Sequence, residues 1–340
     1  MRKIIVLFFL FLAVLVTSSC KEKEKNKGEI KNSSALFPVV QNGKVGYIDK
    51  TGKIVIKPQF DAASDFSEGL ALVVVDGKRG YIDRTAKMVV KPQFDNTWGF
   101  SEGLASVNIG GKYGYVDKTG KLVIKPQFDV ASNFSEGLAL VVVNGKRGYI
   151  DKTGKVVIEP QFDGASDFSE GLASVNMGGK HGYIDKTGKI VIKQQFNVAS
   201  NFSEVLALIV IKGKRGYIDK TGKIVIKPQF SSASNFSKGL ARVVVNGKVG
   251  YIDRTGKMAI KPQFDGASDF SEGLALVGIN GKVGYIDRTG KIVINPQFDG
   301  ASNFSKGLAI VYINHKQGYI DKSGNYVWNP TGYSLPHKHP

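Results

Sequence analysis

The stretch GKVGYIDKTGKIVIKPQFDAASDFSEGLALVVVD, at residues 43–76, decides the fold, because near-copies of it follow one another along most of the chain. Its tetrad GYID, once GYVD, begins at nine glycines that are each 34 residues apart: Gly46, Gly80, Gly114, Gly148, Gly182, Gly216, Gly250, Gly284 and Gly318. A second landmark, Phe-Ser-(Glu/Lys), recurs at the same interval from Phe66 onward. An invariant period of this length predicts a tandem array, in which each unit buries its apolar side against its neighbours.

Each unit is divided into short strands by its own turn residues. The apolar run Leu70–Val75 leads into Asp76-Gly77, a pair typical of a two-residue hairpin turn with positive φ. The second strand, Lys78–Ile82, is followed by a turn equivalent to Asp49–Gly52, which fits a type I turn closed by a left-handed glycine. The third strand, Ile54–Lys57, ends at a proline, which cannot donate to a sheet. The sequence therefore predicts an all-β protein made of nine tandem three-stranded meanders.

The strand register predicts which side of each meander is buried. The second turn pairs Ile48 with Ile54 and Tyr47 with Val55. One face then keeps apolar residues or glycine in every unit, at the positions of Ala71, Val73, Gly80, Ile82, Ile54 and Ile56. The other face holds the positions of Leu72, Val74, Arg79, Tyr81 and Val55, and it is mixed, since the residues at the Leu72, Val74 and Arg79 positions change between units. We expect the constant face to be the core. The proposed register separates the constant residues from the variable ones, whereas a shift of one residue would mix them.

The linking stretch between meanders carries a recurrent pair of phenylalanines, first Phe60 and Phe66. Because a buried Phe contributes roughly 1.5–3 kcal/mol, we expect these pairs to pack between meanders. We expect the array to span residues 35–330 and to form an open β-solenoid or superhelix, with a closed β-propeller as the alternative. Propeller blades usually have four strands, nine blades make a large ring, and no strand is left over to close one. Residues 331–340 are a polar tail.

Residues 1–19 have the pattern of an export signal. Two basic residues precede an apolar run from Ile4 to Val16, which is too short for a comfortable membrane span. Small residues then lead to Cys20, the single cysteine of the sequence. This arrangement resembles a bacterial lipoprotein signal, although Thr17 stands where such signals usually have leucine. The resemblance implies that Cys20 is acylated and becomes the mature N-terminus.

Residues 20–34 are charged and polar without periodicity, which is typical of a solvated tether. A lone cysteine cannot form an internal disulfide, and acylation explains its presence in an oxidising compartment. A secreted protein with an incidental cysteine is the alternative. We therefore expect an exported protein, anchored by lipid to a bacterial membrane at the outer membrane or the periplasmic face.

The formal net charge of +18 has two interpretations. A strongly basic chain suggests affinity for anionic glycolipid, nucleic acid or acidic protein. Lysines at exposed turns and strand margins can instead keep sheet edges from pairing with other molecules. We favour the second interpretation, because Lys recurs at fixed turn positions with Asp and Glu between them. No specific nucleic-acid partner is predicted.

No group of residues in the sequence points to catalysis, a metal or a cofactor. There are four histidines, and two of them lie in the tail. The Asp that opens each turn, such as Asp49, can bond backbone donors there, whereas a calcium ladder along stacked Asp would need converging oxygens. The recurrent carboxylates at the positions of Asp61 and Glu68 are replaced in some units, and no unit has a carboxylate pair of its own. An enzyme is therefore not expected.

The repeated string resembles the bacterial WG repeat family, whose units read roughly GKWGYIDKTGK, and the resemblance covers residues 35–329. The chain departs from that family at the Trp, which is replaced in all nine units. The residues at this position are Val45, Arg79, Tyr113, Arg147, His181, Arg215, Val249, Val283 and Gln317. The resemblance implies an exported or envelope β-repeat protein and brings no established activity or catalytic residue.

We predict a non-enzymatic binding or scaffold protein of the bacterial envelope that uses the variable face. Its candidate binding residues are Arg79, Tyr113, Arg147, His181, Arg215 and Arg242. Possible partners are a protein or an anionic glycan, in addition to the membrane that holds the lipid. A structural spacer without a ligand is the first alternative, and a hydrolytic enzyme is the remote one.

Overall fold

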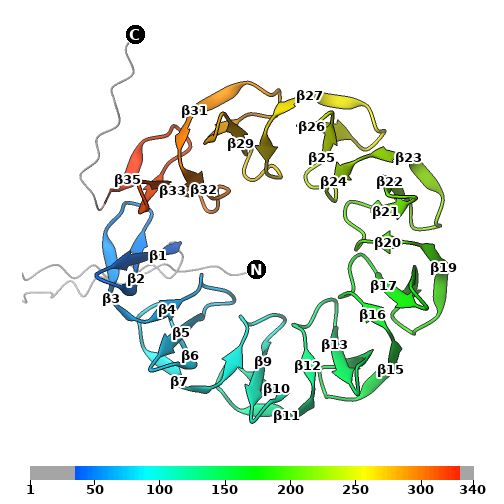
Figure 1. Cartoon of the computed structure of the whole chain (residues 1–340). Helices are drawn as coiled ribbons and strands as arrows, with labels where there is room; N and C mark the ends of the chain where they lie inside the picture. Colours follow the sequence, from blue (N-terminus) through cyan, green and yellow to red (C-terminus); the bar gives the residue numbers. More distant parts are fainter. Residues whose placement is uncertain (1–34, 330–340) are drawn as a thin grey trace, which may run out of the picture. The chain divides into compact units, whose positions relative to one another are not determined.

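The computed structural model describes residues 35–329, and every helix or strand element in that range is a β-strand. The strands form nine separate small sheets, each antiparallel and built from consecutive strands, which we call blades 1 to 9. Blade 1 has three strands, and blades 2 to 9 have four. Figure 1 shows the blades side by side in a ring, with the shortest strands toward the centre and long strands such as β11, β15 and β19 at the rim.

Four kinds of strand recur, in order from the centre to the rim. The inner strands are β4 (Ala62–Ala63), β8 (Asn96–Thr97), β12 (Val130–Ala131), β16 (Gly164–Ala165), β20 (Val198–Ala199), β24 (Ser232–Ala233), β28 (Gly266–Ala267) and β32 (Gly300–Ala301). The second strands are β1 (Leu36–Gln41), β5 (Ala71–Val75), β9 (Leu104–Ile109), β13 (Leu138–Val143), β17 (Leu172–Met177), β21 (Ala207–Ile211), β25 (Leu240–Val245), β29 (Ala275–Ile279) and β33 (Ala309–Ile313).

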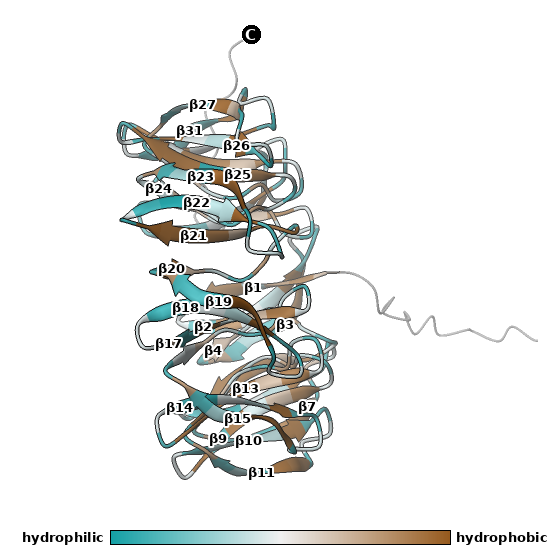
Figure 2. Cartoon of the chain, turned by 90° about the vertical axis from the view of Figure 1, so that its right-hand side faces the viewer, coloured by the Kyte–Doolittle hydropathy of each residue, from teal (hydrophilic) through white to brown (hydrophobic). Residues whose placement is uncertain are grey.

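Each second strand is followed by a hairpin turn into a third strand. The third strands are β2 (Lys44–Asp49), β6 (Lys78–Ile82), β10 (Lys112–Asp117), β14 (Lys146–Asp151), β18 (Lys180–Asp185), β22 (Lys214–Ile218), β26 (Lys248–Asp253), β30 (Lys282–Ile286) and β34 (Lys316–Ile320). The outer strands are β3 (Ile54–Phe60), β7 (Met88–Phe94), β11 (Leu122–Phe128), β15 (Val156–Phe162), β19 (Ile190–Phe196), β23 (Ile224–Phe230), β27 (Met258–Phe264), β31 (Ile292–Phe298) and β35 (Tyr326–Trp328). In Figure 2 the strands carry most of the hydrophobic colour.

The all-β prediction and the nine units are confirmed, but the strand number was underestimated. Two residues of each linking stretch, such as Ala62–Ala63, pair with the second strand of the next blade and make it four-stranded. A two-residue strand shows no alternation that could be read from sequence. The prediction that blades would lack a fourth strand was therefore wrong.

The core lies between blades, and both faces of a blade contribute to it. Between blades 2 and 3, for example, Tyr81, Val90 and Phe94 of one blade pack against Ala105 and Val107 of the next. The constant face was correctly predicted to be buried, since Ala71, Val73 and Ile82 have no exposed surface. The other face is also buried at its tyrosine. In the ring, this face of each blade packs against the constant face of the following blade.

The phenylalanine pairs pack between blades, as predicted. Phe94 and Phe100 both belong to the cluster between blades 2 and 3. The ring of Phe100 lies 4.7 Å from that of Tyr81, centroid to centroid, in a tilted arrangement. Equivalent tyrosine–phenylalanine contacts of 4.7–5.0 Å recur at all eight linking stretches.

The outer strand departs from the expected register. Ile48 pairs with Ile54 as predicted, but Tyr47 pairs with Ile56 rather than Val55 because β3 bulges. A second, larger shift then places Phe60 opposite Val45. Ile56 is consequently buried on the tyrosine face, whereas Ile54 is 36% exposed at the rim. The predicted place of Ile56 in the constant face was therefore wrong, whereas Ile54 lies opposite Ile48 of that face as predicted but is partly exposed.

The glycine of the GYID tetrad is required by this bulge. The outer strand crosses so close to Gly148 that an added Cβ would lie 2.5 Å from the Ile158 carbonyl oxygen and 2.6 Å from the Pro160 nitrogen. The proline in the bulge leaves no N–H without an acceptor at this crossing. Glycine and proline thus act together to let two strands of unequal length lie side by side.

The ring is closed by contacts between blade 9 and blade 1. Tyr319 and Leu308 share a buried cluster with Phe37, Val39 and Ile48. The hydroxyl of Tyr319 donates to the Pro38 carbonyl at 2.7 Å, and its ring meets that of Phe37 edge to face at 5.7 Å. The open solenoid was therefore the wrong choice, and the nine-bladed β-propeller is the architecture. Among residues 35–329, the contacts across the seam are made by side chains.

We expect Gly148→Ala to destabilise the protein by about 1–3 kcal/mol, because backbone atoms must move to admit the methyl group. Denaturant unfolding followed by circular dichroism measures the change. Gly266→Ala is the matched control: no atom lies within 4 Å of its Cβ position, and Ala62 occupies the same position in blade 2. It should change stability by less than about 0.5 kcal/mol. Equal effects of the two substitutions would contradict this account of the bulge.

Candidate functional site

The six candidate binding residues lie in six consecutive blades. Five occupy one repeat position on the third strands of blades 2 to 6: Arg79, Tyr113, Arg147, His181 and Arg215. The sixth, Arg242, lies on the second strand of blade 7. All six side chains are half-buried, on the blade face that packs against the following blade. The structure thus places them at successive blade-to-blade junctions.

The three arginines of blades 2, 4 and 6 each reach across a junction. Arg79 donates from Nη1 to the Asp95 carbonyl at 2.9 Å and to the Asn96 side-chain oxygen at 2.5 Å. Arg147 and Arg215 donate in the same way to the carbonyls of Asp163 and Ser231. These carbonyls stand just before the inner strand of the next blade. The arginines therefore help to hold adjacent blades together while part of each side chain stays exposed.

The aromatic residues of blades 3 and 5 occupy the same position with weaker polar contacts. The Asn96 side-chain amide donates to the Tyr113 hydroxyl at 3.4 Å. In blade 5, the Nδ1 atom of His181 lies 3.3 Å from the Ser174 hydroxyl. Burial lowers the pKa of His181, so its imidazole is neutral at physiological pH. This repeat position therefore alternates between a cation and an uncharged ring from blade 2 to blade 6.

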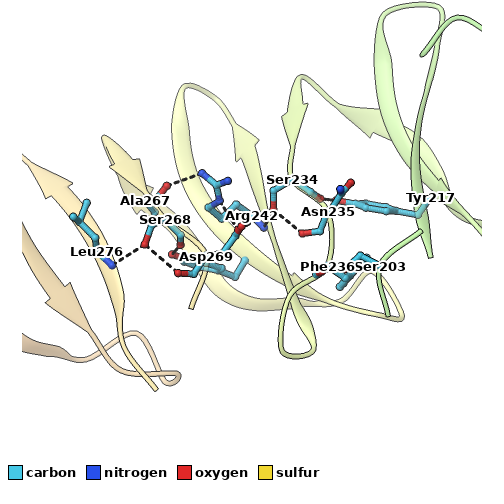
Figure 3. A network of polar contacts seen from close by, with 11 residues as sticks. Ser203, Tyr217, Ser234, Asn235, Phe236, Arg242, Ala267, Ser268, Asp269 and Leu276 are labelled. Carbon is cyan, nitrogen blue, oxygen red and sulfur yellow. Dashed lines mark hydrogen bonds and ion pairs between the residues drawn. The ribbon is translucent and has the colours of Figure 1, made fainter. Parts of the chain in front are cut away.

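Arg242 lies in a small pocket of about 100 Å³ on blade 7, facing blade 8. The pocket is lined by Ser232, Ala233, Ser234, Arg242, Val244 and Val249. Val249 occupies the repeat position that Arg79 fills in blade 2, and its shorter side chain leaves this space open. Arg242 donates from Nε to Asp269 and from Nη1 to the Ala267 carbonyl, both at 2.8 Å (Figure 3). Both acceptors belong to blade 8, so Arg242 also bridges a junction.

Sequence reasoning missed two features that belong with this surface. Asp269 forms an ion pair with Arg242. The sequence did not indicate this pair, because the two residues are 27 positions apart in different units. Trp98 follows the inner strand of blade 3 and is 55% exposed, at a position where the other seven linking stretches have Ser. The single substitution of a large aromatic residue into a Ser position was the signal that could have identified it.

The recurrent carboxylates have structural partners. In blade 4, one oxygen of Asp151 accepts from the Thr153 hydroxyl at 2.6 Å and from the backbone nitrogens of Thr153 and Lys155 at 2.9 and 3.1 Å. This is the turn role that the sequence suggested. Within residues 35–329 no group of three or more His, Cys, Asp or Glu side chains has the arrangement of a metal site.

The glutamates of the Phe-Ser-Glu motif join neighbouring blades. Glu136, for example, pairs with Lys186 at 3.0 Å and accepts from the Gly171 backbone nitrogen at 3.0 Å. Five further ion pairs repeat this geometry: Glu68–Lys118, Glu102–Lys152, Glu170–Lys220, Glu204–Arg254 and Glu272–Lys322. These acids join one blade to the next and are therefore part of the scaffold.

The fold and this surface define a repeat protein of the β-propeller class. A family model described as "WG containing repeat" matches residues 46–78, 80–113, 113–146, 148–180, 182–214, 216–248, 250–282 and 284–316. The chain belongs to this family. The resemblance drawn from the repeated string is thereby confirmed, whereas the lipoprotein signal and Cys20 lie outside the described residues.

A comparison with solved structures supports the fold in one case. A structure described as that of the eukaryotic initiation factor is similar with a TM-score of 0.61 at 12% identity, over 86% of this chain and 95% of that one. BamB from Moraxella catarrhalis matches over 89% of this chain and 94% of its own, at 15% identity, but with a TM-score of 0.41 that is too low to support an inference. No curated protein matches the sequence. No helix that could cross a membrane occurs within residues 35–329.

We expect the unfolding midpoint to fall as the pH drops below about 4, the ordinary Asp value. The hydrogen bond from Thr153, with two backbone bonds, holds the pKa of Asp151 below that value, and the equivalent Asp of seven other turns is shifted the same way. A carboxylate with a lowered pKa stabilises the fold above its unfolded pKa, and this stability is lost as the pH falls through the folded pKa.

Thermal unfolding at pH 6, 4 and 3 measures this dependence, with ionic strength held constant. Asp151→Ala removes the three hydrogen bonds and should lower the midpoint at pH 6 by a few degrees. A midpoint that stayed constant between pH 6 and 3 would contradict the structural role of these carboxylates.

Proposed function

We propose that this protein is a non-enzymatic binding scaffold of the bacterial envelope. In this proposal an acylated Cys20 holds the propeller at a membrane, and the ligand is an anionic glycan. The observation that carries the proposal is chemical: nearly identical blades differ at one half-exposed position, where arginines and aromatic rings replace the Trp of the repeat family.

The residue types at this position suit an anionic sugar polymer. Guanidinium groups bind carboxylate, sulfate and phosphate oxygens in a planar, forked geometry. Aromatic side chains supply stacking area, and Trp98 adds an exposed one. Five successive blades carry one such residue at this position, and Arg242 adds a sixth at another position in the next blade. Together they would give several weak contacts to a repetitive polymer, whose affinities combine. The net charge of +18 favours approach of a polyanion.

We expect the combined variant with Arg79, Arg147, Arg215 and Arg242 changed to Ser to bind dextran sulfate at least about 10-fold more weakly, a loss of about 1.4 kcal/mol. Isothermal titration calorimetry at a fixed salt concentration measures the affinity, with neutral dextran as the ligand control. Circular dichroism checks that the variant is folded, because all four arginines also bond to neighbouring blades.

The matched control removes the same four charges elsewhere. Four exposed lysines of the outer strands, Lys91, Lys125, Lys227 and Lys261, are changed to Ser. If the variable position forms the site, this control should bind within about 2-fold of the parent protein, since charges at the edge of a binding interface contribute little to specific affinity. Equal weakening in both variants would mean a non-specific charge effect. Unchanged binding by the arginine variant would favour a spacer without a ligand.

The envelope location has its own test. We expect full-length protein expressed in bacteria to incorporate radiolabelled palmitate and to sediment with the membranes. Cys20→Ser should abolish labelling and release the protein, because acyl chains provide the membrane affinity. Thr17→Leu, which restores the usual residue of such signals, is the matched change that should keep labelling intact. Palmitate incorporation by the Cys20→Ser variant would overturn this part of the proposal.

A further inference from the structure

An aspartate at the start of most linking stretches joins the hairpin turns of two neighbouring blades. Between blades 4 and 5, one oxygen of Asp163 accepts from Lys146 Nζ at 2.5 Å and the other from the Gly178 backbone nitrogen at 3.0 Å. The lysine leaves the hairpin of one blade, and the nitrogen opens the hairpin of the next. We call these acids the junction aspartates. Their ion pairs are Lys44–Asp61, Lys78–Asp95, Lys112–Asp129, Lys146–Asp163, Lys248–Asp265 and Lys282–Asp299.

Two successive junctions have lost this carboxylate. Asn197 replaces the aspartate between blades 5 and 6, and Ser231 replaces it between blades 6 and 7. The two junctions lie on either side of blade 6, which contains β20 and β22 (Figure 1). The lysines of these junctions, Lys180 and Lys214, are retained and exposed, and neither forms an ion pair within the described part of the chain. Two cations are thus left without the negative charge that pairs with their equivalents in other blades.

The backbone nitrogens that open the hairpins are affected as well. Where the carboxylate is present, this nitrogen bonds to it, as Asn144 does to Asp129 at 2.9 Å. The equivalent nitrogens at the two altered junctions belong to Lys212 and Asn246, and neither donates to an acceptor among residues 35–329. Each altered junction therefore presents an ammonium group and a backbone N–H that, in other blades, bind the two oxygens of one carboxylate.

The hairpin of blade 6 adds a further positive charge at the same place. Its first turn residue is Lys212, whereas the other eight hairpins have Asn, Asp or Gly there. Lys212 has a φ of 48°, a conformation that Asn, Asp and Gly adopt more readily than Lys. Relative to the commonest residue at each position, Asn197, Ser231 and Lys212 each make this side of blade 6 more positive by one charge. The partly exposed guanidinium of Arg215 stands beside Lys214 in the sequence.

We propose that the hairpin turns on either side of blade 6 form two anion sites, where a carboxylate or sulfate group of the ligand takes the role of the junction aspartate. One site consists of Lys180 and the Lys212 backbone nitrogen, and the other of Lys214 and the Asn246 backbone nitrogen. Bonds from an ammonium group to an oxyanion are among the stronger hydrogen bonds in proteins. Two sites one blade apart suit successive anionic groups of a polymer, whose affinities combine. This inference rests on the anionic ligand of the proposed function but assigns it to residues other than the four arginines.

Nuclear magnetic resonance of the ¹⁵N-labelled protein, titrated with sodium sulfate against sodium chloride at equal ionic strength, tests the two sites directly. The amide signals of Lys212 and Asn246 should shift with sulfate, because their nitrogens bond to the added anion. The amide signals of Asn144 and Asn280 should stay in place, because these nitrogens already bond to Asp carboxylates. Equal shifts at all four amides, or none at Lys212 and Asn246, would overturn the proposal.

Exchange of the junction residue gives the reciprocal test. The double substitution Asn197→Asp and Ser231→Asp restores the carboxylate that the other junctions carry, so the variant should fold and lose the sulfate response. Asp163→Asn removes the carboxylate between blades 4 and 5 and should make the Gly178 amide respond to sulfate. A sulfate response that persists after the double substitution would show that the missing carboxylates are not its cause, and would refute the assignment.

Calorimetric titration with dextran sulfate at a fixed salt concentration extends the test to a polymer. The double substitution Asn197→Asp and Ser231→Asp should weaken binding at least about 5-fold, because it fills both sites from within the chain. The matched control, Asn201→Asp with Asn235→Asp, adds the same charge to the same linking stretches, beyond the inner strand. Asp already occupies this position in blades 2, 5 and 8. The control should bind within about 2-fold of the parent protein, since exposed charges at a distance are screened.

The outcomes separate this inference from the proposed function. Weaker binding by the arginine variant, with unchanged binding by the double Asp variant, would keep the proposed function and overturn the two anion sites. Weaker binding by the double Asp variant alone would support the anion sites and remove the variable position from the proposed function. Equal weakening by the double Asp variant and its control would mean a general charge effect, and would overturn the anion sites.

Discussion

The structure depends on one contact that is repeated at every junction: a tyrosine of one blade packs on a phenylalanine of the next and bonds to its backbone. In blade 4, Tyr149 lies 4.8 Å from Phe168 between ring centroids and donates its hydroxyl to the Ser166 carbonyl at 2.7 Å. The ring supplies apolar area and the hydroxyl fixes the angle, so neighbouring blades can meet in one way only. Burial raises the pKa of Tyr149, which keeps its hydroxyl protonated as a donor.

Because this contact links one blade to the next rather than closing within a blade, no blade is complete alone. A single sheet of this size buries too little apolar surface to be stable. An open array would leave the tyrosine face of the last blade and the small-residue face of the first in water. Closing the ring removes both exposed faces. At the seam, where the pattern of phenylalanines is interrupted, Phe37 supplies the missing ring against Tyr319.

The structure also distinguishes the positions that hold the blades in place from the position that varies between them. Turn aspartates bond to backbone nitrogens, glutamates pair with lysines of the next blade, and the glycine of each tetrad lies beneath a bulge. The turn aspartate and the tetrad glycine recur in all nine units, and the glutamate is replaced only by Lys238 and Lys306. The position of Arg79 is not constrained in this way, since valine, tyrosine, histidine and glutamine replace it in other blades. Variation at a half-exposed position on an invariant frame is the setting in which repeat proteins acquire binding surfaces.

The period, the hairpins and the constant apolar face were determined by the sequence alone, because turn residues and alternation are local properties. Val73 was predicted buried from its neighbours along the strand and is buried. The exchange of Val55 for Ile56 opposite Tyr47 could not be read in this way, because a bulge is set by how two strands of unequal length meet. The candidate site shows the same division: the sequence identified the variable positions, but it did not indicate the bonds from Arg79 and Arg242 to the next blade. Only the tertiary structure decided that the array closes. Closure depends on the total of the small rotations between nine successive blades, and the sequence of a single unit does not determine this total.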